Sequence, residues 1–155
     1  MAKYQMTLMT QSEAEHIAAE WKYDGMYHFY NLDQDEEDLA LFLDPKARKD
    51  KVFAVKKREE LVGFAEVMME NNIAEIGFGM RPDLTGKGLG HAFVSFLVDT
   101  IQETYSPDSI TLAVATFNQR AITLYKRIGF QETARFNQAT NGDVFPFVQM
   151  VLHTK

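Results

Sequence analysis

Five of the nine glycines in this 155-residue sequence lie within a single window of 14 residues. They are Gly77, Gly79, Gly86, Gly88 and Gly90. Glycine lets a ligand approach the main chain closely, and the first N–H groups of a helix are unpaired and lie at the positive end of its dipole. Because the window joins a β-rich run to a stretch with helical periodicity, it predicts a phosphate-binding loop. The alternative is a tight turn with a close helix–strand contact, for which one or two glycines suffice.

The spacing excludes two common phosphate-binding motifs. A P-loop needs a glycine, four residues, and then Gly-Lys followed by a hydroxyl residue. Here Arg81 stands at the first glycine position, and Gly88 follows Lys87. The dinucleotide fingerprint needs a third glycine where this sequence has His91. Another kind of phosphate loop is therefore needed.

Two segments resemble the GNAT superfamily of N-acetyltransferases. The segment from Met80 to Gly90, MRPDLTGKGLG, resembles the acyl-CoA pyrophosphate loop, in which an aliphatic-x-Pro step and an Arg/Gln-x-x-Gly-x-Gly/Ala loop open a long helix. The segment from Leu112 to Phe130, LAVATFNQRAITLYKRIGF, resembles the second cofactor motif, a strand, an Asn-x-x-Ala-x-x-x-Tyr helix and a closing Gly-Phe. The resemblance covers about 73–130, and the first 50 residues match only in their helix pattern.

The resemblance implies that acetyl-CoA is the cosubstrate and that backbone amides of the loop hold its pyrophosphate. Thr85 stands where the family usually has Arg or Gln, which weakens the expected binding, and Lys87 can replace part of the missing charge. Asn118 contacts the pantetheine arm in relatives, although it would equally serve as a helix N-cap. The cofactor is expected between strands 73–80 and 110–115, bound by Phe78, Gly79, Met80, Thr85, Gly86, Lys87, Gly88, Leu89, Gly90 and Asn118.

Acyl transfer to an amine needs a base, because an amine with a pKa of about 10.4 arrives protonated at neutral pH. Glu75 is the first candidate, since it lies mid-strand between Ala74 and Ile76, which point to the opposite face, and relatives often carry a carboxylate nearby. The alternatives are a water relay as the base and a purely solvent-facing role for Glu75.

The reaction also develops an oxyanion and a thiolate, and both need a donor. In the family, backbone amides at the position of Gly79 or Met80 receive the thioester carbonyl, and the tyrosine of the second motif, here Tyr125, protonates the sulfur. Because Tyr125 shares a helical face with Ala121 and Ile122, it is alternatively a core aromatic with its hydroxyl at the edge.

The sequence defines the binding site of the acceptor amine less well than the cofactor site. Aromatic residues crowd 21–31 and, with the 141–147 segment, are candidates for the acceptor wall. The candidate substrate-binding residues are Trp21, Tyr27, Tyr30 and Glu66, with Tyr23 beside them. Such a wall in an acidic chain suits a cation, but the same aromatics can simply pack the first helices onto the sheet, which is the favoured interpretation for most of them. The four scattered histidines have no ligand spacing, so no metal site is expected.

Composition restricts the class of protein. A net charge of −6 argues against nucleic-acid binding, and no run of apolar residues approaches a membrane span. The absence of cysteine rules out a disulfide and a cysteine acyl intermediate, so the amine must attack directly. We expect a cytoplasmic protein with no membrane or nucleic-acid partner, and a homodimer as the assembly typical of small enzymes.

Periodicity predicts helices over about 12–21, with a Ser12/Glu15 capping box, and over 35–43, stopped by Pro45. Runs 51–57 and 61–69 predict an antiparallel hairpin, and 73–80 a third strand. A long helix begins near residue 89, a strand covers 110–115, a helix covers 118–128, and two strands flank Asn141-Gly142.

These elements predict a single domain over 1–155 with an α/β (α+β) GNAT-like fold. Its sheet is mixed but mostly antiparallel, with six or seven strands and about four flanking helices. The expected activity is direct transfer of an acetyl group from acetyl-CoA to a primary amine in a ternary complex. One alternative is a non-enzymatic acyl-CoA sensor or interaction module. A nucleotide-binding protein is a further alternative, and the failed P-loop spacing argues against it.

Overall fold

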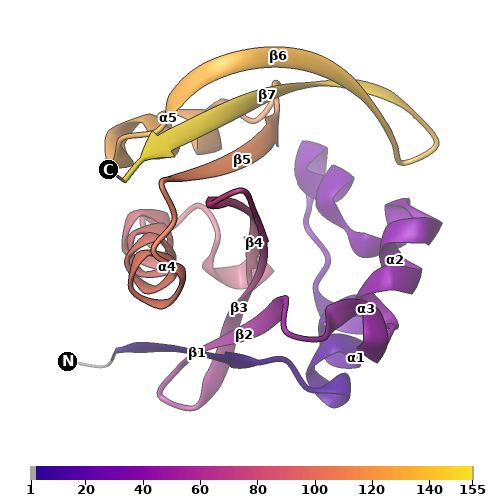
Figure 1. Cartoon of the computed structure of the whole chain (residues 1–155). Coiled ribbons are helices and arrows are strands. Elements are labelled where there is room, and N and C mark those ends of the chain that lie inside the picture. Colours follow the sequence, from indigo (N-terminus) through magenta and orange to yellow (C-terminus); the bar gives the residue numbers. More distant parts are fainter. Residues whose placement is uncertain (1–2, 155) are drawn as a thin grey trace. The chain divides into compact units, whose positions relative to one another are not determined.

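The computed structural model describes residues 3–154 and contains a seven-stranded sheet in the order β1-β2-β3-β4-β5-β7-β6 (Figure 1). This confirms the mixed α/β fold class and the six or seven strands expected. The strands are β1 (Tyr4–Leu8), β2 (Val52–Lys57), β3 (Glu60–Glu70), β4 (Ile73–Met80), β5 (Ser109–Ala115), β6 (Gln131–Thr140) and β7 (Asp143–His153).

Five α-helices and three short 3₁₀ helices complete the described part of the chain. Four of the α-helices have eight residues or more, which agrees with the expected number. The α-helices are α1 (Gln11–Glu20), α2 (Glu36–Leu43), α3 (Pro45–Arg48), α4 (Gly90–Tyr105) and α5 (Gln119–Ile128), and the 3₁₀ helices are η1 (Gly25–Tyr30), η2 (Leu32–Gln34) and η3 (Pro82–Leu84).

Strand pairing confirms the predicted hairpin and adds a strand that the sequence did not predict. β2 and β3 pair antiparallel across a turn in which Arg58 and Glu59 have positive φ. β1 pairs antiparallel with β2, from Tyr4 opposite Lys57 to Leu8 opposite Phe53. β1 is only five residues long, and three of its positions are exposed. Its apolar and polar residues alternate, but so short a run is weak evidence for a strand without its partner.

The chain divides into two compact units built from interleaved segments. Unit 1 contains residues 3–66, 78–85 and 139–143 of the described chain, and unit 2 contains 67–77, 86–138 and 144–154. Because β3 and β4 each contribute residues to both units, neither unit is a continuous stretch of sequence. The expectation of a single domain over 1–155 stays a prediction.

The core of unit 1 forms where α1 and α2 meet β2. Ala14, Ile17 and Trp21 are buried together with Phe42 and Val52. The ring of Phe64 packs between two of these aromatics, with its centroid 6.2 Å from that of Trp21 and 5.5 Å from that of Phe42. In Figure 1, α1, α2 and α3 gather in one group.

Two details at the helix ends of unit 1 differ from the sequence prediction. The capping box is formed by Thr10 and Glu13 rather than by Ser12 and Glu15, so α1 begins at Gln11. Both pairs fit the same spacing, and the Thr10 pair makes both reciprocal hydrogen bonds, at 2.9 and 3.1 Å. Pro45 ends α2 as expected but also opens α3, because proline is suited to the first turn of a helix.

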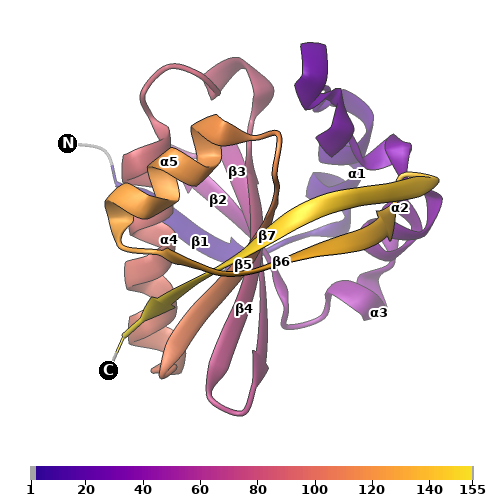
Figure 2. The ribbon, with the colours of Figure 1, turned by 90° about the horizontal axis from the view of Figure 1, so that it is seen from above.

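Unit 2 is built around α4, the long helix predicted from the sequence. Its apolar face buries Phe93, Val94, Leu97, Val98 and Ile101, while His91 is exposed as expected. β5 pairs antiparallel with β7, and Figure 2 shows β7 running beside β6 as a long curved hairpin.

Candidate active site

The glycine-rich loop leads into a helix N-terminus that no side chain caps. Gly86 and Gly88 have φ values of +72° and +76°, which residues with a Cβ rarely adopt. A Cβ at Gly88 would meet open space, so this glycine is needed for backbone conformation rather than for packing. Leu89 occupies the N-cap position of α4 and makes no side-chain hydrogen bond there. The N–H groups of the first turn are therefore left for a ligand or water.

Two other glycines of the window fit the packing alternative. A Cβ at Gly90 would lie 2.9 Å from Leu124 Cδ2, and one at Gly79 would lie 2.7 Å from the ring of Phe64. Gly77 has open space around it and no positive φ. The window thus combines a loop shaped for close approach to the backbone with two tight packing contacts.

Arg120 lies beside the loop, and the sequence analysis missed it. Its Nη1 atom would be 3.1 Å from a Cβ built at Gly86, and the residue is exposed in the first turn of α5. Within the second motif Arg120 occupies a position that the pattern leaves undefined. The only feature of the sequence that could have indicated a role for Arg120 is its positive charge two residues after Asn118. The guanidinium places a positive charge next to Gly86.

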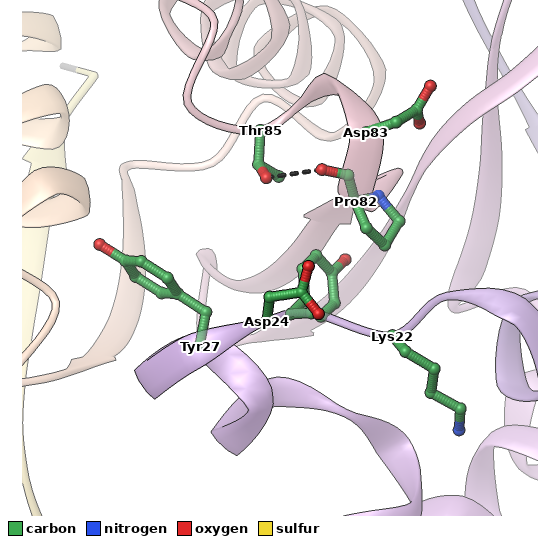
Figure 3. Close-up of a pocket in the computed structure, with 7 residues that line it drawn as sticks. Lys22, Asp24, Tyr27, Pro82, Asp83 and Thr85 are labelled. Carbon is green, nitrogen blue, oxygen red and sulfur yellow. Dashed lines mark hydrogen bonds between the residues drawn. The ribbon is translucent and has the colours of Figure 1, made fainter.

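Thr85 takes part in a local turn. Its hydroxyl donates to the carbonyl of Pro82 at 2.7 Å, a bond drawn in Figure 3. A threonine has only one hydroxyl proton, so that proton is already used within the loop. A role for Thr85 in cofactor binding stays a prediction, and its visible contribution is to fix the turn that precedes Gly86.

The second motif forms α5 as predicted. Asn118 caps the helix, with its Oδ1 accepting from the N–H of Ala121 at 3.2 Å, and Gly129 closes it with a φ of +126°. Tyr125 is half-buried, and its ring lies 6.2 Å from that of Phe130 at an interplanar angle of 60°. Asn118 therefore caps the helix, and Tyr125 packs edge-on against Phe130, as the structural alternatives expected. The cofactor role of Asn118 and the acid role of Tyr125 remain predictions.

Glu75 lies where the parallel pairing of β4 and β5 ends. The recorded ladder joins Ile73, Ala74 and Glu75 to residues 109–111, although both strands continue further. Glu75 is exposed while Ala74 and Ile76 are buried, which confirms that it points to the opposite face from them. Whether its carboxylate serves as the base stays a prediction.

The candidate acceptor residues fall into different environments within unit 1. Trp21 is only 5% exposed and belongs to the core, which favours the packing interpretation for this residue. Tyr30 is half-buried edge-on to Phe29, with ring centroids 5.3 Å apart, and Glu66 is exposed on β3 opposite Val52. Tyr27 is half-buried and lines a pocket of this unit.

That pocket has a volume of about 420 Å³ and is formed by two stretches of unit 1 (Figure 3). One stretch follows α1 and the other is the loop before Gly86. The lining residues are Lys22, Tyr23, Asp24, Tyr27, Pro82, Asp83 and Thr85. Its volume falls in the range of small-molecule sites.

Tyr23 joins the two stretches that line the pocket. Its hydroxyl donates to the carbonyl of Met80 at 2.6 Å, and its N–H donates to Asn31 Oδ1 at 2.6 Å. Burial raises the pKa of Tyr23 well above the ordinary value for a phenol, so the hydroxyl stays a donor. The end of β4, where the family resemblance places the thioester amides, is thereby held to the segment after α1.

The turn between β6 and β7 is held to the same part of unit 1. Asp35 accepts from the N–H of Asn141 at 2.9 Å and from the Thr140 hydroxyl at 3.2 Å, while Asn141 Nδ2 donates to the carbonyl of Phe29 at 2.9 Å. The N–H groups of Asn141 and then Asp38 lower the pKa of Asp35. These bonds support η1, which carries Tyr27.

Residues 3–154 include no group of three or more His, Asp or Glu side chains placed to hold a metal ion. In the same part of the chain, the helices are too short or too polar to cross a membrane.

The model of the acetyltransferase (GNAT) family matches residues 12–130. The chain belongs to the GNAT family. It is therefore an acetyltransferase, and the resemblance drawn from its two glycine-containing motifs is confirmed. A search of curated proteins gave no match.

Solved structures of similar fold cover nearly the whole chain. A chimera of the spermidine N-acetyltransferase SpeG from Vibrio cholerae and hSSAT has a TM-score of 0.74 and 20% identity, covering 97% of this chain and 95% of that one. SpeG from Vibrio cholerae in complex with manganese ions has a TM-score of 0.72 and 19% identity, with 97% and 92% covered. A dodecameric structure of the Vibrio cholerae enzyme has a TM-score of 0.70 and 18% identity, with 97% and 93% covered. At these identities the likeness establishes the GNAT fold of this chain.

Proposed function

We propose that this GNAT acetyltransferase transfers the acetyl group of acetyl-CoA directly to a primary amine within a ternary complex. The observation that carries the proposal is the uncapped N-terminus of α4 behind Gly86 and Gly88, with Arg120 beside the loop. Backbone N–H groups, a helix dipole and a guanidinium form a donor set suited to a pyrophosphate. Acetyl-CoA brings an activated thioester to this site.

The loop residues divide the task of holding the cofactor. Gly86 and Gly88 give the backbone the positive φ values that expose its N–H groups, while Lys87 and Arg120 add positive charge. Asn118 keeps its cap on α5, and its side chain contacts the pantetheine arm. Thr85 and Leu89 shape the loop on either side of the two glycines.

The chemical roles are divided among residues of β4 and α5. Glu75, or a water that it holds, takes the proton of the acceptor ammonium so that the nitrogen lone pair can attack the thioester carbon. N–H groups near Gly79 and Met80 stabilise the oxyanion. As the carbon–sulfur bond breaks, Tyr125 donates its phenolic proton to the sulfur. With no cysteine in the sequence, no cysteine thiol can carry the acetyl group.

A thiol-release assay with acetyl-CoA and a panel of amines tests the proposal. The panel contains spermidine, which the names of the structural neighbours suggest, together with an aminoglycoside and a peptide with a free N-terminus. Amine-dependent release of CoA supports the proposal. CoA binding by calorimetry without release for any amine would instead favour an acyl-CoA sensor. Native mass measurement of the same sample tests the proposed homodimer.

A further inference from the structure

The pocket of unit 1 contains one carboxylate without a counter-charge. Lys22 forms an ion pair with Asp33 at 3.1 Å, and Asp83 forms one with Arg81 at 2.6 Å, so both of these charges are compensated. The Asp24 carboxylate makes no hydrogen bond or ion pair with any residue of the described chain, and it does not cap η1 although it stands at the N-cap position. Figure 3 shows the side chain of Asp24 between Tyr27 and Pro82.

The other pocket walls suit a cation with an aliphatic chain. Tyr23 and Tyr27 contribute aromatic rings, and Pro82 contributes an apolar ring. Aromatic faces attract ammonium groups and also pack against methylene groups. The hydroxyl protons of Tyr23 and Thr85 are both used in bonds to backbone carbonyls, so neither is available as a donor to an anion.

These charges disfavour a phosphate in the pocket. A negative group would meet the uncompensated Asp24 carboxylate without a free cation beside it, because Lys22 is paired outside the pocket with Asp33. A positive group would gain an ion pair in a partly enclosed site. The pocket therefore carries a negative charge, whereas the loop at Gly86 and Gly88 carries a positive one. The two differ in this way although Pro82 and Thr85 come just before that loop in the chain.

We propose that the pocket lined by Asp24, Tyr27 and Pro82 binds the non-reacting ammonium group of a diamine or polyamine acceptor, with the Asp24 carboxylate as its counter-ion. This rests on the proposed acetyl transfer to an amine and names the acceptor class. Asp24 is a specificity-determining residue that selects acceptors carrying a second positive charge, and it takes no part in the transfer itself.

Asp24→Asn tests the proposal cleanly. Asparagine is as suitable as aspartate at an N-cap position, and no side-chain cap bond is lost, so the fold is retained. The probes are putrescine and butylamine, which share a four-carbon chain and differ in the second amino group. We expect the ratio of kcat/KM for putrescine to that for butylamine to fall about fivefold, the upper size of an exposed ion pair. Asp24→Glu should restore part of the ratio because it keeps the charge.

Asp50→Asn is the matched control. Asp50 is exposed in the same unit, lies outside the pocket and has a φ of 60°, which asparagine also tolerates. The Asp50→Asn substitution removes the same single negative charge. It therefore measures how much the net charge of the protein, without the pocket, contributes to attracting a cation. An equal fall in the ratio for Asp24→Asn and Asp50→Asn would overturn the proposal, as would an unchanged ratio in Asp24→Asn.

Calorimetry separates failure of this site from failure of the proposed function. If the wild type releases no CoA with any amine, acetyl transfer to these acceptors is wrong, but spermidine binding can still be measured. Weaker binding of spermidine to Asp24→Asn than to Asp50→Asn would then support the pocket as a cation site. Equal binding to the two variants would overturn it.

Discussion

The loop at Gly86 and Gly88 in unit 2 and the pocket at Asp24 in unit 1 present opposite charges by different means. The loop presents backbone N–H groups and the Arg120 guanidinium, and is positive. The pocket presents a carboxylate and aromatic side chains, and is negative. A site made from the backbone depends on a few glycines, whereas a site made from side chains can change its ligand without any change of fold. In our proposals, the first region binds the cofactor common to the family, and the second region selects the acceptor.

Tyr125→Phe should give the largest effect and tests the chemical step on the unit 2 side. Removing the phenolic proton donor should lower kcat about 100-fold, because a positioned general acid contributes on that order or more. The affinity for CoA by calorimetry should change little, since the ring and its packing against Phe130 are kept. An unchanged kcat would remove Tyr125 from the acid role.

Arg120→Ala tests whether the loop in unit 2 binds its ligand through positive charge, in contrast to the negatively charged pocket in unit 1. Losing a guanidinium beside Gly86 should raise the Kd for CoA about tenfold, and should reduce the salt dependence of binding. Arg127→Ala is the control, because Arg127 is also exposed on α5 but stands in its last turn. If both variants bind CoA equally well, Arg120 is not part of the phosphate site.

The motif residues explain why one region could be predicted and the other could not. Gly86, Gly88 and the closing Gly129 have positive φ, and Asn118 caps α5 with its side chain, so these local requirements make their spacing in the sequence informative. The same local logic predicted β4, α4 and α5. Arg120 escaped notice because only the folded chain brings it to Gly86.

The acceptor side depends on contacts between distant segments. Tyr23 reaches Met80 over 57 positions, and Asp35 reaches Asn141 over 106. Asp24 has no motif and no helical periodicity, so only the pocket around it draws attention to it. β1 is a further case, because its alternating run of five residues is too short to predict a strand, and its pairing with β2 identifies it.

Tyr23→Phe tests whether unit 1 also supports the end of β4. Losing the bond to the Met80 carbonyl should lower the free energy of unfolding by about 1 kcal/mol, the usual net value of a hydrogen bond. If this bond also positions the neighbouring amides, kcat should fall more than KM rises. Thermal unfolding and steady-state kinetics on the same preparation measure both. No change in either would remove Tyr23 from the positioning role.

The smallest expected effect is a pH dependence carried by Asp35. Its pKa in the folded protein is lowered by the Asn141 and Asp38 N–H groups, so its contribution is present above the unfolded-state pKa, about 3.9, and is lost as the pH falls through the lower folded value. Asp35→Asn should therefore flatten the fall in melting temperature below about pH 4. A fall of unchanged steepness in this variant would contradict the assignment.

Initial rates with acetyl-CoA and the acceptor amine both varied test the central claim, direct transfer in a ternary complex, most directly. Direct transfer predicts double-reciprocal lines that intersect, together with no acetylated protein by intact mass after incubation with acetyl-CoA alone. Parallel lines and a protein that carries one acetyl group and passes it to the amine would contradict the account.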